Sequence, residues 1–144
     1  MSYRGTFTPK NIQKYIGDYK KIVYRSLWER KFMTFCDNNP TVVKWSSEEV
    51  AIPYLSPIDG KYHRYFVDFL VEFDTKTGKE VFLIEIKPKR QCKPPEKKKR
   101  TTKSFLKEVQ TWQVNNSKWT HAKKFAEQNK WKFKILTEDD LNIK

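Results

Sequence analysis

The chain has 144 residues, the usual size of one domain and enough to bury a hydrophobic core. Its 30 lysines and arginines against 17 aspartates and glutamates give a formal net charge of +13, which favours a polyanionic partner. Aromatic residues make up 15% of the chain, too many for a disordered basic tail. We therefore expect a single folded basic domain over residues 1–144.

Composition and motifs also exclude several classes of protein. No apolar run reaches the roughly 18 residues that a membrane span needs, and the amino-terminal segment lacks the apolar centre of a secretory signal. Cys36 and Cys92 are too few for a disulfide framework or a four-cysteine zinc site, and they favour a reducing, intracellular compartment. There is no Gly-rich phosphate loop, so we expect no nucleotide cofactor. Because there is also no long apolar run, we expect no membrane partner.

The first half of the chain predicts a helix followed by strands. Residues 1–22 form a basic, aromatic stretch without clear periodicity, which we interpret as an arm or cap. Apolar residues at helical spacing predict a helix over 26–38. Segments rich in β-branched and aromatic residues predict strands over 42–54, 65–73 and 81–88. The turn signal SPIDG (56–60) separates the first two strands and indicates a hairpin, and a second turn is predicted over 74–79.

The second half predicts a loop, helices and a last strand. Three prolines and dense positive charge indicate a basic loop over 88–103. Helical spacing over 105–112 pauses at Asn115-Asn116-Ser117 and resumes over 119–126, with Ser117 as the expected N-cap of the second piece. A short strand is predicted over 133–136 and a polar helical end over 137–144. This order predicts an α/β domain with a mixed central sheet flanked by helices.

Charged residues interrupt two of these strands where apolar residues are expected. The segment VFLIEIK (81–87) begins apolar on both faces, as in a central strand, yet contains Glu85 and Lys87 on one face. In YFVDFLV (65–71), Asp68 stands among apolar and aromatic residues. A tight turn joins the two strands, so we expect them to pair and to bring Asp68 and Glu85 together.

Two convergent carboxylates indicate a metal site. They repel one another, and a divalent ion removes this conflict; their hard oxygen ligands suit Mg²⁺ or Mn²⁺. Lys87 would offset the charge that develops when a phosphodiester is attacked. The alternative is structural: Glu85 and Lys87 form an ion pair at the edge of the sheet, and Asp68 caps a turn.

Asp68 and the segment Glu85-Ile86-Lys87, after a helix that carries Glu29, resemble the PD-(D/E)xK nuclease superfamily, which has the restriction-endonuclease-like fold. Val67 stands where the name of the superfamily has proline. The segments KYIGDYKKIVYRSLWERKF, IPYLSPIDGKYHRYFVDF, FLIEIKPK and KFKILTEDDL are similar to those of the head completion nucleases of T-even-like tailed bacteriophages. The chain also resembles, more loosely, the endonuclease subunit of heteromeric transposases.

This resemblance implies an α-β-β-β-α-β core and metal-dependent cleavage of double-stranded DNA. It implies a metal centre of Glu29, Asp68 and Glu85, with Lys87 as the catalytic lysine and the backbone carbonyl of Ile86 as a further ligand. It also implies a role after DNA packaging and before tail joining, with portal or head-completion proteins as partners, in the host cytoplasm or on the virion. Glu29 has an alternative role, because Ser26 and Glu29 fit a capping box and Arg25 offers Glu29 an ion pair.

The basic loop directly follows the predicted catalytic strand and is the candidate DNA-binding segment. Its basic residues are Lys89, Arg90, Lys93, Lys97, Lys98, Lys99, Arg100 and Lys103. A solvated loop and a localisation signal are the alternatives for this segment. For the whole chain, the rivals to an endonuclease are a non-enzymatic DNA-binding protein of head completion or head–tail joining, and a transposase-type endonuclease subunit.

Overall fold

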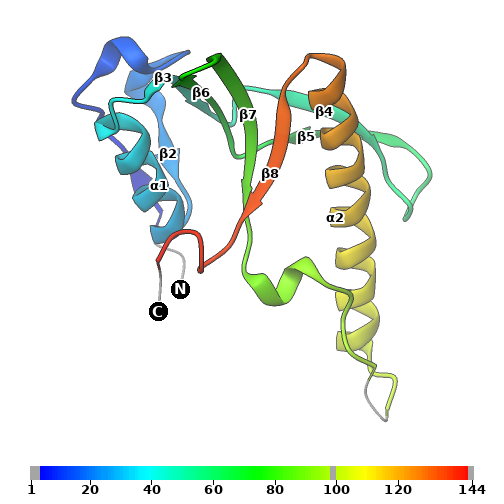
Figure 1. Cartoon of the computed structure of the whole chain (residues 1–144). Helices are drawn as coiled ribbons and strands as arrows, with labels where there is room; N and C mark the ends of the chain where they lie inside the picture. Colours follow the sequence, from blue (N-terminus) through cyan, green and yellow to red (C-terminus); the bar gives the residue numbers. More distant parts are fainter. Residues whose placement is uncertain (1–3, 98–99, 143–144) are drawn as a thin grey trace.

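The apolar segment that contains Glu85 forms β7, Gly78–Ile86, an interior strand of a four-stranded sheet. The computed structural model, which describes residues 4–97 and 100–142, orders this sheet β3-β6-β7-β8 (Figure 1). β3, Val42–Ser47, and β6, Phe69–Thr75, run antiparallel, as do β6 and β7, whereas β8, Lys132–Leu136, is parallel to β7. The predicted mixed sheet is confirmed.

The register of β6 and β7 places the two predicted acidic positions opposite each other. Phe69 pairs with Ile84, so the next position outward sets Asp68 against Glu85. The hairpin turn lies between Thr75 and Gly78, which makes it shorter than the predicted turn over 74–79. The predicted pairing of these two strands is confirmed.

One face of the sheet is covered by α1, Leu27–Asn38. The Ser26 hydroxyl accepts the Glu29 backbone N–H at 3.1 Å and caps the amino terminus of the helix, as predicted. Phe32, Met33 and Cys36 recur at helical spacing and are buried. Helical periodicity therefore predicted the extent of this helix and part of the face it buries, whereas Phe35, which belongs to the same pattern, is 42% exposed.

The opposite face is covered by α2, Lys103–Gln128, a single long helix (Figure 1). The predicted pause at 115–117 is wrong, as is the N-cap at Ser117: Thr102 caps the helix by accepting the Phe105 N–H at 3.1 Å. Ser117 instead donates its hydroxyl to the Leu55 carbonyl at 2.6 Å. Tertiary packing of Asn115 and its neighbours overrides the low helix propensity of the Asn-Asn-Ser segment.

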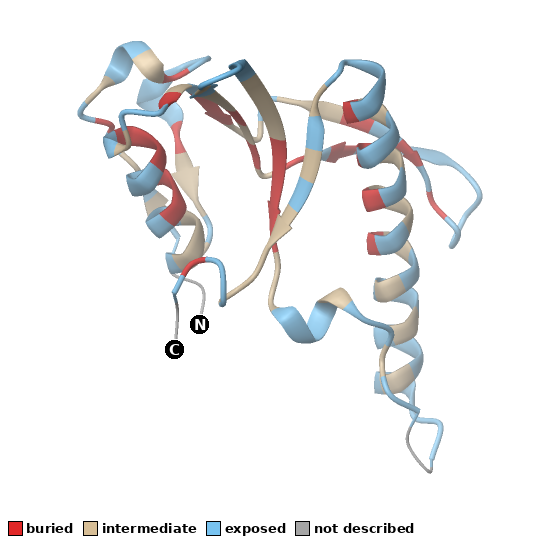
Figure 2. Ribbon diagram, viewed as in Figure 1, coloured by how far each residue is buried: buried red, intermediate tan, exposed pale blue. Residues whose placement is uncertain are grey.

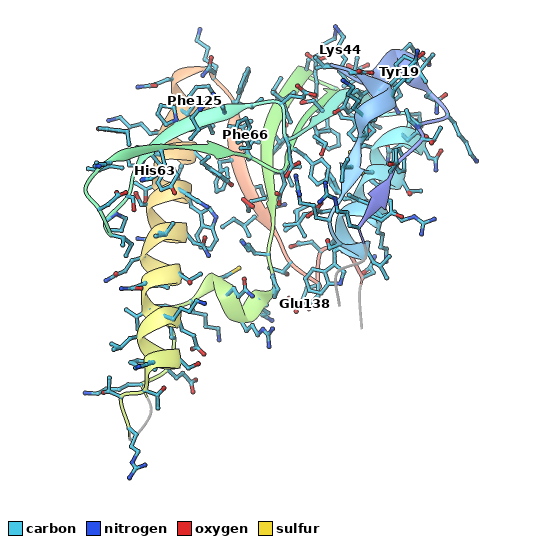
Figure 3. The ribbon with its side chains drawn as sticks, turned by 180° about the vertical axis from the view of Figure 1, so that it is seen from behind. Tyr19, Lys44, His63, Phe66, Phe125 and Glu138 are labelled. Carbon is cyan, nitrogen blue, oxygen red and sulfur yellow. The ribbon has the colours of Figure 1, made fainter. Side chains whose placement is uncertain are left out.

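A separate hairpin, β4 (Ala51–Leu55) and β5 (Tyr62–Phe66), crosses α2 (Figures 1 and 3). This hairpin corrects two predicted strands. The strand predicted over 42–54 is divided at Glu48, whose φ of 53° lies in the left-handed region and breaks the extended backbone. The strand predicted over 65–73 is likewise divided, and Asp68 lies at the bend between its two parts.

The described terminal segments pack against the α1 face. β1, Gly5–Thr6, pairs with β2, Val23–Tyr24, and Tyr15 and Ile22 are buried, so residues 4–22 form a cap. The polar helical end predicted over 137–144 is wrong for its described part, because residues 137–142 form turns that bury Leu141. Neither described helix combines the length and the apolar character that crossing a membrane requires.

The sheet separates two hydrophobic cores (Figure 2). The α1-side core contains the buried residues Tyr15, Ile22, Phe32, Met33, Cys36, Val42, Trp45, Phe69, Val71, Ile84, Ile86 and Leu141. The α2-side core contains Ile52, Tyr54, Tyr65, Val67, Leu83, Ala122 and Ala126. Without the small β1–β2 and β4–β5 sheets, the helices α1 and α2 and the remaining strands follow the order α1, β3, β6, β7, α2, β8, which confirms the α-β-β-β-α-β core.

Candidate active site

Glu85 lies near the end of β7, on the side of the sheet that faces α2. Side chains alternate along a strand, so Glu85 shares this side with Leu83 of the α2-side core. Glu85 is only 6% exposed, and the Tyr65 hydroxyl of β5 donates a hydrogen bond to its Oε2. Burial of a carboxylate lowers stability unless the charge is compensated, so this position points to binding or chemistry.

Asp68 lies beside Glu85 and is held by the backbones of two neighbouring segments. Its Oδ2 accepts the Ile86 N–H at 2.8 Å, and its carbonyl accepts the Glu48 N–H at 3.0 Å. The side chains of Asp68 and Glu85 also hydrogen-bond to each other. The structure thus brings together the two carboxyl groups that the strand pattern predicted would meet.

The ionisation of the two carboxyl groups is coupled. Burial raises the pKa of Asp68 well above its usual range, and the neighbouring Glu85 carboxylate raises it further. Burial also raises the pKa of Glu85, although hydrogen bonds from Tyr65 and Asp68 and the charge of Lys87 act in the opposite direction. Without a metal ion, one proton shared by the pair is therefore favoured over two negative charges side by side.

This pair fits a divalent cation, which would replace the shared proton and neutralise both carboxylates. Their oxygens are the hard ligands that Mg²⁺ and Mn²⁺ prefer. The carbonyl oxygen of Ile86, between Glu85 and Lys87 in the chain, is also a hard ligand. Within residues 4–97 and 100–142, no three carboxylate, histidine or cysteine side chains gather as a metal-binding group. Asp68 and Glu85 are thus the acidic pair around which a site would form.

Lys87 follows β7 directly and lies close to this pair. Its backbone N–H donates to the Leu136 carbonyl at 3.0 Å and prolongs the pairing of β7 with β8. Its positive charge lowers the pKa of both Asp68 and Glu85. The predicted grouping of an aspartate, a glutamate and a lysine is therefore present in the structure.

Glu29 lies at the start of α1 and does not complete a three-carboxylate cluster with them. Its Oε2 accepts the Arg25 backbone N–H at 2.9 Å, one residue before the Ser26 N–H of an ideal capping box. The predicted ion pair of Arg25 with Glu29 is wrong, because the Arg25 guanidinium pairs with Glu48 at 3.0 Å. Burial raises the pKa of Glu29, and the charges of Asp68 and Glu48 add to the rise. Its role as a metal ligand stays a prediction.

Comparison with known proteins assigns the chain to a family. The family described as "TnsA-like endonuclease N terminal" matches residues 39–138. The chain belongs to this family. A protein named "Head completion nuclease", from Enterobacteria phage T4, is 47% identical over 145 residues, which cover 98% of this chain and 95% of that protein. The resemblance to phage head completion nucleases is confirmed, as is the looser one to transposase-type endonucleases.

The part of the chain that matches the TnsA-like endonuclease family contains Asp68, Glu85 and Lys87 but begins after Glu29. Two further residues near the pair, Tyr65 and Lys118, were missed by sequence reasoning. Tyr65 lies in the same segment as Asp68. Its alternation with Val67, which places both side chains on one face, was the signal that could have indicated it. Lys118 comes from α2, and nothing in its local sequence distinguishes it from the other lysines.

The eight predicted DNA-binding residues are arranged differently from a simple loop. Residues 89–92 form a 3₁₀ turn, and Lys103 is the first residue of α2. Lys98 and Lys99 lie outside the described residues. The Lys89 ammonium pairs with Asp139 at 3.0 Å. The backbone N–H of Lys89 donates to the side chain of Glu138, which is labelled in Figure 3.

The other part of this basic segment packs beside the first half of α2. An open groove of about 680 Å³ separates them. Its basic lining residues are Arg90 and Lys93 from the loop and Lys107 from α2, and Trp112 forms part of its wall. The lining also contains Glu96 and Glu108. Figure 1 shows α2 running past the sheet beside this segment.

Proposed function

We propose that this endonuclease hydrolyses the phosphodiester bonds of double-stranded DNA with a Mg²⁺ or Mn²⁺ ion held by Asp68 and Glu85. When bound, such an ion supplies Lewis-acid activation of the phosphoryl group and of the attacking water. The observation that carries the proposal is the buried, hydrogen-bonded pair of carboxyl groups beside Lys87. Its shared proton marks a site that a cation would neutralise.

The protein residues in this mechanism have separate tasks. Tyr65 and the Ile86 N–H orient the two carboxyl groups, each through one hydrogen bond. Lys87 supplies the ammonium that would offset the negative charge that grows on the phosphate oxygens during attack. Glu29 is proposed as a third acidic member of the centre, reached from α1.

The basic residues after β7 hold the DNA backbone without reading its bases. Duplex DNA carries one charge per about 1.7 Å of its axis, and a row of lysines and arginines suits this spacing. We expect the contribution of Lys89 to be the smallest among the described ones, because Asp139 already neutralises its ammonium. The net charge of +13 supplies the long-range attraction.

We further propose that cleavage takes place during completion of a tailed-phage head, after packaging and before tail joining, in the host cytoplasm. The similarity to a protein named head completion nuclease supports this role. Portal or other head-completion proteins are the proposed partners. The role predicts that an Asp68→Asn protein does not restore infectivity to heads that lack this nuclease. Restoration of full infectivity by this variant would favour a non-enzymatic structural protein.

A plasmid-nicking assay with Mg²⁺ or Mn²⁺ tests the nuclease directly. The wild-type protein should nick supercoiled DNA, and chelation of the metal should stop it. Glu85→Gln should be inactive, because the amide keeps the shape of the side chain but binds metal poorly. Glu80→Gln on the same strand is the control, since its exposed ion pair with Lys132 contributes little. Equal cleavage by the wild type and Glu85→Gln would contradict the assignment.

A further inference from the structure

A second lysine approaches the acidic pair from the opposite layer of the molecule. Lys118 of α2 places its ammonium 5.5 Å from the ring centre of Tyr54 and 5.6 Å from that of Tyr65. The Tyr65 hydroxyl in turn donates to Glu85. Tyr65 thus links the ammonium of Lys118 to the buried carboxylate of Glu85, although the two residues are 33 positions apart in the chain.

The position of Lys118 is fixed on both sides of it in the helix. The Ser117 hydroxyl anchors α2 to β4 through the Leu55 carbonyl at 2.6 Å, and Trp119 is buried. The two tyrosine rings, from neighbouring strands of the β4–β5 hairpin, give the ammonium a preferred place by cation–π attraction. The position of the Lys118 side chain is therefore fixed by packing, unlike that of a lysine on an exposed helix face.

The ammonium of Lys118 has hydrogen-bonding capacity to spare. It has three donors, and the hydrogen bonds and ion pairs found among residues 4–97 and 100–142 do not include it. Its side chain is half-buried. Burial lowers its pKa, as does the charge of Lys87, while the nearby charges of Glu85 and Asp68 raise it. A half-buried cation with unused donors next to two carboxylates suits an anionic ligand that arrives at the same place.

We propose that Lys118 is a second active-site lysine, which contacts a non-bridging oxygen of the DNA phosphodiester that is cleaved. The two carboxylates and Lys87 approach this phosphate from the sheet, and Lys118 approaches it from α2. The inference rests on the proposed nuclease function. The alternative is that the ammonium only packs between the two tyrosines and supports their position.

Single-turnover cleavage of a DNA duplex at saturating protein tests the proposal, with DNA binding measured in Ca²⁺ and thermal unfolding followed in parallel. Lys118→Met keeps the aliphatic stem and removes the charge. Its cleavage rate should fall by about a hundredfold, the usual loss for one donor to a developing oxyanion. Binding should change by less than about threefold, because one charge of many contributes little affinity. The Tm should stay within about 4 °C of the wild type.

Two further variants separate chemistry from packing. Lys118→Arg keeps a positive donor over the tyrosine rings and should retain at least a tenth of the wild-type rate. Lys124→Met removes an exposed charge from the same helix and should cleave like the wild type. If Lys118→Met lowers the folded fraction, the rate per folded molecule and the Lys118→Arg rate decide the question.

Wild-type cleavage by Lys118→Met would overturn the inference and leave the nuclease function in place. Lys118→Arg as inactive as Lys118→Met, with both unstable, would also overturn it in favour of packing. A wild-type protein that does not cleave DNA in any metal ion, by contrast, would contradict the nuclease function itself, and this inference with it.

Discussion

The two faces of β7 serve opposite purposes. Phe82, Ile84 and Ile86 point into the α1-side core, where the lining is apolar and the packing is dense with aromatic rings. Leu83 and Glu85 point towards α2, where a smaller apolar core gives way to charged groups at the end of the strand. One side of the strand stabilises the fold, and the other holds a site that costs stability.

This difference shows how a small domain supports a destabilising centre. The buried carboxyl groups are unfavourable in the metal-free protein, since burial raises the pKa of both. The site is tolerated because the large α1-side core fixes the ends of β6 and β7 from behind. Changes on the two sides should therefore separate activity from stability.

The sharpest separation is expected from Glu85→Gln. Loss of a metal ligand removes several kcal/mol of transition-state stabilisation, so cleavage should fall on the order of a thousandfold. The metal-free variant should be as stable as the wild type or more stable, because the amide carries no buried charge and still accepts the Tyr65 hydrogen bond. Nicking assays and urea unfolding in EDTA measure the two effects. A large loss of stability would show that Glu85 serves the fold.

Ile84→Ala, next to Glu85 but on the α1 side of β7, should lower stability and leave the activity of the folded protein unchanged. Ile84 is 3% exposed, and its truncation should lower the free energy of unfolding by about 2–5 kcal/mol. Cleavage per folded molecule should stay near the wild-type value at low temperature. Urea unfolding and cleavage corrected for the folded fraction test this. Inactivity of the fully folded variant would break the division of tasks between the two sides.

The pH dependence of stability is the next largest expected difference between the α2 side and the α1 side of β7. The folded protein keeps a proton at the acidic pair, and the unfolded chain releases it above the ordinary aspartate pKa of 3.8. Stability in EDTA should therefore fall as the pH rises above this value, by up to about 1.4 kcal/mol per pH unit for one proton. Asp68→Asn should remove this part of the slope.

The same experiment with Mn²⁺ should stabilise the wild type at neutral pH and leave Asp68→Asn nearly unchanged. The difference between the two proteins is the quantity to measure, because other carboxyl groups titrate in both. Parallel pH profiles of the wild type and Asp68→Asn would contradict the shared proton.

The smallest effect is expected at Glu29, which tests whether the α1 layer also contributes to the site. Glu29→Gln keeps an oxygen that accepts the Arg25 N–H, so stability should change by less than about 1 kcal/mol. Cleavage should fall by about tenfold if Glu29 supports the metal centre. Wild-type cleavage by Glu29→Gln would leave Glu29 with a capping role alone.

The elements with strong local signals were predicted from the sequence. The spacing of Phe32 and Cys36 defined α1, and apolar residues on both faces marked β7 as a central strand. The pairing of two anomalous strands across one tight turn was enough to bring Asp68 and Glu85 together. These features depend on contacts that are close in the chain.

The errors come from contacts that are distant in the chain or from backbone conformations that have no local signal. The helix break at Asn115 was predicted from propensity, which the packing of α2 on the hairpin overrides. The division at Glu48 depends on a left-handed residue that no glycine signals. Lys118 was not predicted because its partners, Tyr54 and Tyr65, belong to a hairpin more than 50 residues earlier in the chain.

The central claim, one cation shared by Asp68 and Glu85, is tested most directly by a crystal soaked in Mn²⁺ and measured for anomalous scattering. The account predicts a peak within coordination distance of both side chains, and its loss in Asp68→Asn crystals soaked in the same way. A peak elsewhere, or none at saturating Mn²⁺ while the two carboxyl groups stay hydrogen-bonded to each other, would contradict it.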